Sequence, residues 1–272
     1  MIPAPTIPLN DNRDIPQLGL GVYKALDGDE VRAVRHALDV GYRHVDTAVV
    51  YGNEAGVAEG IRTSGVDRDE VFVTTKVWND DIRAGNTIGS VEGSLARMQF
   101  DYLDLVLLHW PVDNRLKAWE DLVALRERGL VRSIGVSNFT AAHLEELIDA
   151  SGVPPALDQI EFHPFLQQLP IVEACRRHKV AISAWSPLMQ GKGLDEPLLN
   201  EIAARHGRSP AQVILRWDIQ HGIIPLPKSV TPARIEENFG VFDFGLADAE
   251  MLALNDLDRN HRYGPDPDNF AF

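Results

Sequence analysis

Cysteine, basic residues and long apolar runs are all scarce in this 272-residue chain, and each scarcity excludes a class of protein. The single cysteine, Cys175, excludes a fold held by internal disulfides, and its helical, apolar surroundings predict a packed side chain rather than a reactive thiol. Lys and Arg number 26 against 40 Asp and Glu, and this formal charge of -14 disfavours nucleic acids and anionic membranes as partners. No run approaches the ~18 apolar residues of a membrane span, and no targeting signal opens the chain, so we expect a cytoplasmic protein.

Short apolar runs alternate with helical periodicity along the whole chain, and no linker or low-complexity segment interrupts them. The apolar runs predict strands over 18–23, 44–50, 71–75, 103–108, 132–136, 157–161, 180–184 and 223–226. The helical patterns cover 29–40, 90–98, 118–128, 141–149, 169–178, 197–206 and 211–220. This alternation indicates about eight β-then-α units around a parallel sheet.

The turn after the first strand decides between an open sheet and a barrel. A dinucleotide-binding open sheet carries Gly-x-Gly-x-x-Gly at this turn, but Gly19 and Gly21 are followed by no third glycine. We therefore predict the α/β class with a (β/α)8 TIM barrel, formed as a single domain by residues 1–272. Active sites of such barrels lie at the carboxyl ends of the strands.

Polar residues stand at those ends. Asp46, Lys76 and His109 each follow an apolar run directly, and Tyr51 comes shortly after Asp46. Because neighbouring parallel strands lie about 5 Å apart, these side chains are expected to converge at one mouth of the barrel. Alternatively, Asp46 and Lys76 form a structural ion pair, Tyr51 packs in a loop and His109 is a core histidine. Three ionisable residues at one rim favour the catalytic interpretation over a purely structural set.

Several motifs in the same order closely resemble the aldo-keto reductases, including bacterial members near the 2,5-diketo-D-gluconic acid reductases. They are His44-Val45-Asp46-Thr47-Ala48, Tyr51-Gly52-Asn53-Glu54, Thr74-Thr75-Lys76-Val77-Trp78, Leu107-Leu108-His109-Trp110-Pro111, Ile134-Gly135-Val136-Ser137-Asn138-Phe139, Pro227-Lys228-Ser229 and Gly264-Pro265-Asp266-Pro267. The resemblance covers nearly the whole chain. It implies a monomeric barrel oxidoreductase that reduces aldehydes and ketones to alcohols with NADPH and without a Rossmann fold.

The resemblance implies a catalytic tetrad of Asp46, Tyr51, Lys76 and His109. Carbonyl reduction needs a hydride from the nicotinamide and a proton for the oxygen, and Tyr51 is the expected proton donor. The Lys76 ammonium is expected to lower the pKa of Tyr51, while Asp46 keeps Lys76 protonated. His109 is expected to orient the carbonyl as a neutral imidazole.

The resemblance also implies the cofactor contacts. Ser137, Asn138 and Gln159 match the residues that bind the carboxamide, and Trp185 stands where the nicotinamide ring stacks. Ser137 and Asn138 alternatively cap a helix, and Trp185 is alternatively an ordinary core aromatic. Further expected contacts are Ser186, Leu188, Gly191, Lys228, Ser229, Val230, Arg234, Glu237 and Asn238.

A basic segment after the last strand favours NADPH over NADH. Lys228 and Arg234 flank a predicted helix start, with Thr231 as N-cap and Pro232 in the first turn, and such a start attracts anions. This cluster resembles the pocket for the 2′-phosphate of NADPH. The alternative is a solvated helix start with ordinary surface charges.

The substrate site is expected to be apolar and aromatic, and no metal is expected. By position in the resemblance, its wall comprises Tyr23, Val49, Trp78, His109 and Trp110, with Phe270 and Phe272 of the tail. His44 and Asp46 suggest a metal site only weakly, because Lys76 beside them repels a cation, and His163 is expected in a turn. The second hypothesis for the function is a non-catalytic NADPH-binding regulatory protein on the same barrel.

Overall fold

Eight parallel strands form one sheet in the computed structural model, which describes residues 4–272. The strands are hydrogen-bonded in the order β10-β9-β8-β7-β6-β5-β4-β3, so each lies beside its neighbours in the sequence. Their bounds are β3 (Leu20–Gly21), β4 (His44–Asp46), β5 (Phe72–Val77), β6 (Leu103–Leu108), β7 (Val131–Ser137), β8 (Leu157–Glu161), β9 (Ala181–Trp185) and β10 (Ile224–Pro225). All eight strands fall within or overlap the predicted apolar runs.

The two edges of this sheet meet and close it into a barrel. The backbone amides of Gly19 and Gly21 donate to the carbonyl oxygens of Pro225 and Pro227, each at 3.1 Å. The seam requires glycine, because a Cβ on Gly19 would lie 2.5 Å from the Leu226 side chain. The predicted (β/α)8 barrel is confirmed.

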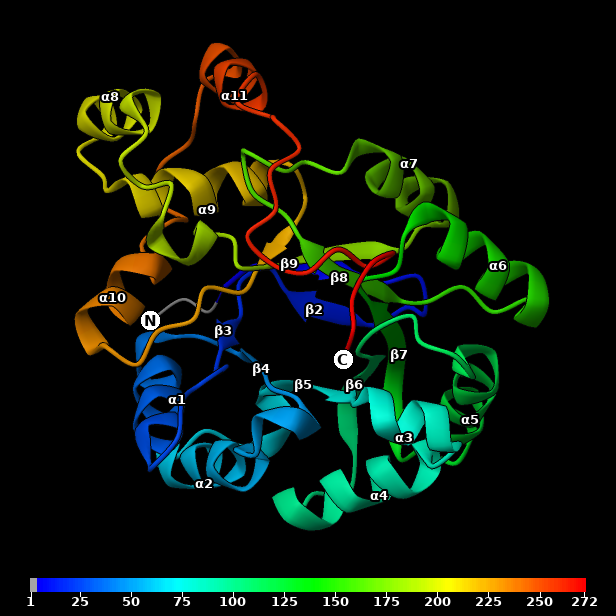
Figure 1. The fold of residues 1–272 in the computed structure, drawn as a ribbon. Coiled ribbons are helices and arrows are strands. Elements are labelled where there is room, and N and C mark those ends of the chain that lie inside the picture. The colour runs from blue at the N-terminus through cyan, green and yellow to red at the C-terminus, as the bar shows by residue number, and fades with distance from the viewer. Residues whose placement is uncertain (1–3) are drawn as a thin grey trace.

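Helices surround the barrel, as Figure 1 shows. Their bounds are α1 (Asp29–Val40), α2 (Glu54–Ser64), α3 (Asn79–Ala84), α4 (Thr87–Met98), α5 (Arg115–Glu127), α6 (Ala141–Ser151), α7 (Leu169–His178), α8 (Pro197–His206), α9 (Pro210–Gln220), α10 (Pro232–Phe239) and α11 (Asp248–Asn255). Helices α2, α3 and α11 were not among the predicted patterns, whereas the bounds predicted for α1, α7 and α8 are confirmed.

The strand predicted over 44–50 is too long. Strand β4 ends at Asp46, and Val49–Tyr51 form a short 3-10 helix in which the Tyr51 amide donates to the Ala48 carbonyl at 3.0 Å. Val49 and Val50 are apolar, so the predicted strand continued past the residue at which β4 ends. This turn matters for function because it carries Tyr51 over the mouth of the barrel.

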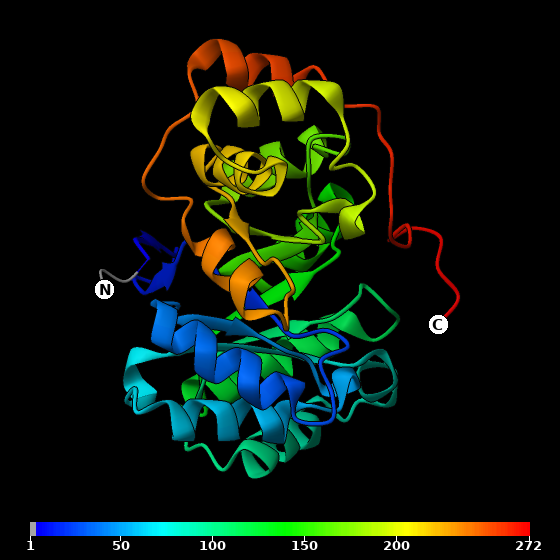
Figure 2. The ribbon, with the colours of Figure 1, turned by 90° about the vertical axis from the view of Figure 1, so that its left-hand side faces the viewer.

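A small hairpin closes the opposite end of the barrel. Its antiparallel strands β1 (Thr6–Pro8) and β2 (Asp14–Pro16) precede the barrel strands. Ile15 is fully buried and belongs to the interior cluster that includes Leu105, Leu107 and Leu157. Figure 2 shows the hairpin and the C-terminal tail on opposite sides of the molecule.

The single cysteine of the chain is packed as expected. Cys175 on α7 is buried, and burial raises the pKa of its thiol. Among residues 4–272, no helix has the length and apolar character to cross a membrane.

Candidate active site

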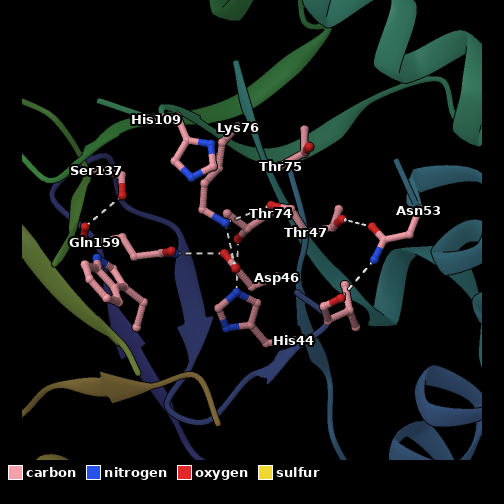
Figure 3. A network of polar contacts seen from close by, with 12 residues as sticks. His44, Asp46, Thr47, Asn53, Thr74, Thr75, Lys76, His109, Ser137 and Gln159 are labelled. Atoms are coloured by element: carbon pink, nitrogen blue, oxygen red, sulfur yellow. Dashed lines mark hydrogen bonds and ion pairs between the residues drawn. The ribbon is translucent and has the colours of Figure 1, made fainter. Parts of the chain in front are cut away.

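The structure brings the four predicted catalytic residues together at the carboxyl ends of β4, β5 and β6, and Figure 3 shows Asp46, Lys76 and His109 among them. The Lys76 Nζ donates to Asp46 Oδ1 at 2.7 Å and to the Thr47 carbonyl at 2.8 Å. The other Asp46 oxygen accepts from Gln159 Nε2 at 2.8 Å. Lys76 has no exposed surface, so its charge is held by these oxygens instead of water.

Tyr51 faces this ion pair across the 3-10 turn. The Lys76 Nζ lies 5.1 Å from the centroid of the Tyr51 ring. The rings of Tyr51 and His109 meet edge to face with centroids 5.9 Å apart, and the Tyr23 ring lies 5.0 Å from Tyr51 on another side. A phenol, an ammonium and an imidazole therefore border one space.

The expectation that Lys76 lowers the pKa of Tyr51 is wrong. Burial, with the Asp46 carboxylate and Tyr23 as further causes, raises the pKa of Tyr51 well above its usual value. The physical reason is that burial disfavours the charged phenolate, and the negative charge of Asp46, which is 2.7 Å from Lys76, disfavours it further. Tyr51 therefore keeps its proton at neutral pH.

The pKa shifts of the two neighbouring bases follow from burial as well. Burial lowers the pKa of Lys76, and the nearby Asp46 carboxylate opposes this by favouring the ammonium. Burial, helped by the charge of Lys76, holds the pKa of His109 well below its usual range. Both effects favour the neutral imidazole that the sequence predicted for His109.

A cavity of about 1240 Å³ opens above these residues. Every predicted cofactor residue lines it: Ser137, Asn138, Gln159, Trp185, Ser186, Leu188, Gly191, Lys228, Ser229, Val230, Arg234, Glu237 and Asn238. Asp46, Tyr51 and His109 also line it, whereas Lys76 lies beneath its floor. The sequence-based prediction missed Lys24, Gln190, Tyr263, Gly264 and Pro265. The last three adjoin or belong to the quoted Gly264-Pro265-Asp266-Pro267 motif, which was the available signal.

One end of the cavity offers amide and hydroxyl groups next to an indole. Trp185 is half-buried, and its Nε1 donates to Asn138 Oδ1 at 2.8 Å. Ser137 Oγ donates to the Gln159 carbonyl at 2.8 Å, while Asn138 Nδ2 donates to the His109 carbonyl at 3.0 Å. The rim therefore holds these polar groups in fixed positions.

The structure contradicts the alternative roles considered for Ser137, Asn138 and Trp185. Thr140, not Ser137 or Asn138, caps helix α6, with His143 completing a capping box, so the capping alternative is wrong. Trp185 faces the cavity and is not an enclosed core residue.

The opposite end of the cavity is basic. Lys228 and Arg234 are exposed there, and neither of them forms an ion pair with a carboxylate among residues 4–272. Thr231 occupies the N-cap position of α10 as predicted, with Pro232 in the first turn, but its side chain makes no capping bond. Unpaired cations at a helix start are suited to an anionic group.

The third wall of the cavity is aromatic. The Phe272 ring stacks on Trp78 with centroids 5.8 Å apart and planes 6° apart, and Phe270 lies 4.7 Å from Trp110. Tyr23, Trp78, His109 and Trp110 line the cavity as predicted. Val49 is not among the lining residues, and its neighbour Val50 is, because the 3-10 turn presents Val50 to the opening.

His44 and His163, which weakly suggested a metal site, do not belong to a set of metal ligands among the described residues. His163 lies in a turn in which the Leu166 amide donates to its carbonyl at 2.9 Å, as predicted. His44 contacts Thr74 instead of a second metal ligand, with Nε2 and Oγ1 3.0 Å apart. No group of three or more His, Cys, Asp or Glu side chains in the part of the chain that the structure describes could hold a metal ion.

Comparisons with known proteins agree with this site. The family model described as "Aldo/keto reductase family" matches residues 17–259. The methylglyoxal reductase DkgA of Yersinia pestis is 48% identical over 276 residues, covering 100% of this chain and 99% of the relative. An aldo/keto reductase structure from Brucella melitensis superposes with a TM-score of 0.91 at 48% identity, covering 94% of this chain and 100% of that one. A Bombyx mori aldo-keto reductase in complex with NADP gives a TM-score of 0.91 at 37% identity, covering 98% and 97%.

Proposed function

The chain belongs to the aldo/keto reductase family and reduces carbonyl compounds with NADPH, and we propose that Tyr51, Lys76, Asp46 and His109 are the residues that carry this reaction. The observation that carries the proposal is the buried pair of Lys76 and Asp46, 2.7 Å apart, directly beneath the phenol of Tyr51. The alternative of a non-catalytic NADPH-binding protein is not supported.

The residues around the cavity fit NADPH. The basic end, with Lys228 and Arg234, suits the phosphates, and the end with Asn138 and Trp185 suits the nicotinamide. When bound, NADPH supplies the hydride that reduces the carbonyl carbon. We assign the remaining predicted cofactor residues to the same surface.

Tyr51 donates the proton that the carbonyl oxygen requires. At neutral pH the phenol holds a proton, which it presents to an oxygen in the cavity. As the proton leaves, the negative charge that develops on the Tyr51 oxygen is stabilised by the nearby Lys76 ammonium. Asp46 and the Thr47 carbonyl keep that ammonium in place.

His109 orients the substrate. Its pKa lies well below the usual range, so the imidazole is neutral and has one N–H to donate to the carbonyl oxygen. Its ring packs against both Tyr51 and Trp78, which fixes its plane at the mouth of the barrel. Two donors thereby converge on one oxygen.

We propose small aldehydes and 2-oxoaldehydes as the substrates. The relative named methylglyoxal reductase is 48% identical to this chain, and the apolar aromatic wall that includes Trp78, Trp110 and Phe272 limits the space beside His109. The remaining expectations stay proposals. They are a single domain over 1–272, whose first three residues lie outside the described part, a monomer whose cavity is complete within one chain, and a cytoplasmic location where NADPH is regenerated.

The substitution Tyr51→Phe tests the proton donor, because it keeps the ring and removes only the hydroxyl. We expect turnover of small aldehydes, followed by NADPH absorbance, to fall by about 100-fold or more, since a positioned acid contributes roughly that much. NADPH affinity, followed by quenching of tryptophan fluorescence, should change little. Retained turnover in the variant would contradict the role of Tyr51, and a wild-type protein inactive toward every aldehyde would contradict the proposed function itself.

A further inference from the structure

The tail after α11 crosses the mouth of the barrel, from the ends of β8 and β9 toward β6 (Figure 1). Two of its attachments border the cavity, and elsewhere Arg262 donates to Gln168 at 2.6 Å and the His261 amide donates to the Phe165 carbonyl at 3.0 Å. The first is next to Trp185, where Tyr263 and Gly264 meet β8, and the second is where Phe270 and Phe272 pack on Trp78 and Trp110. The position of the aromatic wall therefore depends on both fastenings.

A buried carboxylate makes the first fastening. Glu161 is the last residue of β8 and is 1% exposed. Its Oε1 accepts from the backbone amides of Tyr263 at 2.7 Å and Gly264 at 3.1 Å, and its Oε2 accepts from Gly264 at 3.2 Å. Hydrogen bonds to an ionised acceptor are stronger than neutral ones, so two consecutive amides are held firmly.

The charge of Glu161 has few other partners. Among residues 4–272 it forms no ion pair with lysine or arginine, and its only ion-pair contact is His163, whose Nε2 lies 3.3 Å away. Burying a carboxylate is costly unless other groups satisfy it. The tail amides therefore supply much of the hydrogen bonding that Glu161 needs in the folded protein.

Gly264 sets how closely the tail approaches the cofactor end of the cavity. A Cβ at this position would lie 2.2 Å from the edge of the Trp185 ring, so only glycine allows the observed approach. The same indole donates to Asn138, which lies beside His109. Glu161 thus holds the tail directly against a ring that faces the cavity.

Few residues separate the two fastenings. The turn between them contains a bridge of Asp266 with Asn269, and Phe270 follows at once. Because only residues 265–269 separate Gly264 from Phe270 and the Asp266–Asn269 bridge constrains them, we expect a shift at Gly264 to displace Phe270 and Phe272 as well.

We propose that Glu161 is a positioning residue that acts through the tail to fix the substrate side of the cavity. Glu161 does not itself line the cavity but bonds Tyr263 and Gly264, which do, and the inference rests on the proposed reductase function. Releasing the tail should weaken contacts with small carbonyl compounds and open space for bulky ones. The chemical step, which depends on Tyr51 and Lys76, should persist.

The substitution Glu161→Gln tests the carboxylate, because it keeps the size of the side chain and replaces one acceptor with a donor that faces an amide. We expect the KM of a small aldehyde to rise about tenfold with kcat changed less than about twofold. The ratio of kcat/KM for a bulky aromatic aldehyde to that for the small one should rise. Trypsin should also cut after Arg262, which in the wild type is half-buried and bonded to Gln168.

A second variant and a control separate tail position from other effects. Gly264→Ala keeps the Glu161 carboxylate but pushes the tail away from it and from Trp185, because the added Cβ would lie 2.2 Å from the Trp185 ring and 3.4 Å from Glu161 Oε2, and it should give the same KM change and the same new cleavage. Asp268→Asn alters an exposed acid of the same tail, 3.8 Å from His143, and should behave like the wild type.

The cleavage result and the kinetic result fail independently. If Glu161→Gln leaves Arg262 as protected as in the wild type and KM unchanged, the positioning role is overturned. If kcat falls by the same factor for small and bulky aldehydes, the residue acts on the whole site and the proposal is equally overturned. A wild-type protein without turnover would contradict the reductase function, whereas the tryptic comparison would still report on the tail.

Discussion

Lys228 and Arg234 lie at the same end of the cavity although a helix start separates them in the sequence. Both are exposed, so each interaction with a bound anion is screened by water and salt. A 2′-phosphate distinguishes NADPH from NADH and carries the charge that such cations favour. We therefore expect the preference for NADPH to depend on these two side chains.

We predict that Arg234→Gln weakens NADPH binding about tenfold, roughly 1.4 kcal/mol, and leaves NADH binding within twofold. The loss should shrink as salt is added, because the interaction is electrostatic. Titrations of tryptophan fluorescence with both cofactors measure this. The matched control is Arg35→Gln on α1, which is exposed and does not line the cavity. Equal losses of affinity for NADPH and NADH would show that Arg234 does not bind the 2′-phosphate.

The sequence indicated the positions of the proposed catalytic residues but not the direction of the pKa shift of Tyr51. Asp46, Lys76 and His109 were found because each ends an apolar strand, a pattern that can be read from one chain. The raised pKa of Tyr51 depends on its burial and on the Asp46 carboxylate, which is held beside Lys76. Neither the burial of Tyr51 nor the position of Asp46 can be read from the sequence. Val50 was missed in favour of Val49 because the local turn could not be told from a strand.

At the scale of elements, β4 shows how one strand combines chemistry with stability. Asp46 at its end faces the cavity, whereas His44 points into the barrel and is 1% exposed, with Nε2 in contact with Thr74 Oγ1. Burial lowers the pKa of His44 to about 4, despite the opposing charge of Asp46. The strand therefore favours the neutral imidazole.

This shift predicts a loss of stability in acid. The pKa of His44 falls from 6.5 to about 4 on folding, so the unfolded chain binds the proton more readily. Stability from this group is present above about pH 6.5 and is lost as the pH falls toward 4, by about 2 to 3 kcal/mol. His109 acts in the same direction, whereas the raised pKa values of Asp158 and Asp218 act in the opposite one.

The variant His44→Gln isolates the contribution of His44, because its amide can still bond Thr74 and does not titrate. Urea unfolding at about pH 7 and about pH 4.5 should show a drop that is smaller in the variant by about 2 kcal/mol. His36→Gln provides the control, since that histidine is half-exposed on α1. Identical drops in wild type and His44→Gln would contradict the assignment.

Elements with strong local signals were predicted, and those without were not. Helix α1 ends at Gly41, whose φ of 121° suits glycine, and α9 starts at Ser209, which forms a capping box with Gln212. Helix α2 contains two glycines that weaken its pattern, and the hairpin strands are three residues each. Such elements are stabilised by packing on the barrel, which a single sequence does not display.

At the scale of the whole molecule, the two ends of the barrel have different tasks. The cavity with Tyr51 and Trp185 lies at the carboxyl ends of the strands, and the hairpin with Ile15 seals the other end (Figure 2). The interior between them is filled by side chains such as Leu105, Leu107 and Leu226. Because the barrel is closed and its interior is filled, we expect a substitution at one end to leave the structure of the other end unchanged.

We predict that Ile15→Ala lowers the free energy of unfolding by about 2 to 5 kcal/mol, because it leaves a hole among fully buried side chains. Since this hole lies at the end opposite to Tyr51, kcat and KM should stay within about twofold of the wild type at temperatures well below unfolding. Urea unfolding and aldehyde reduction on the same preparations measure both quantities. Leu252→Ala, which removes a side chain that is 64% exposed on α11, should change stability by less than about 0.5 kcal/mol. A fall in kcat that tracks the lost stability would mean that the packing of the sealed end reaches the catalytic residues, and the separation of tasks would then be wrong.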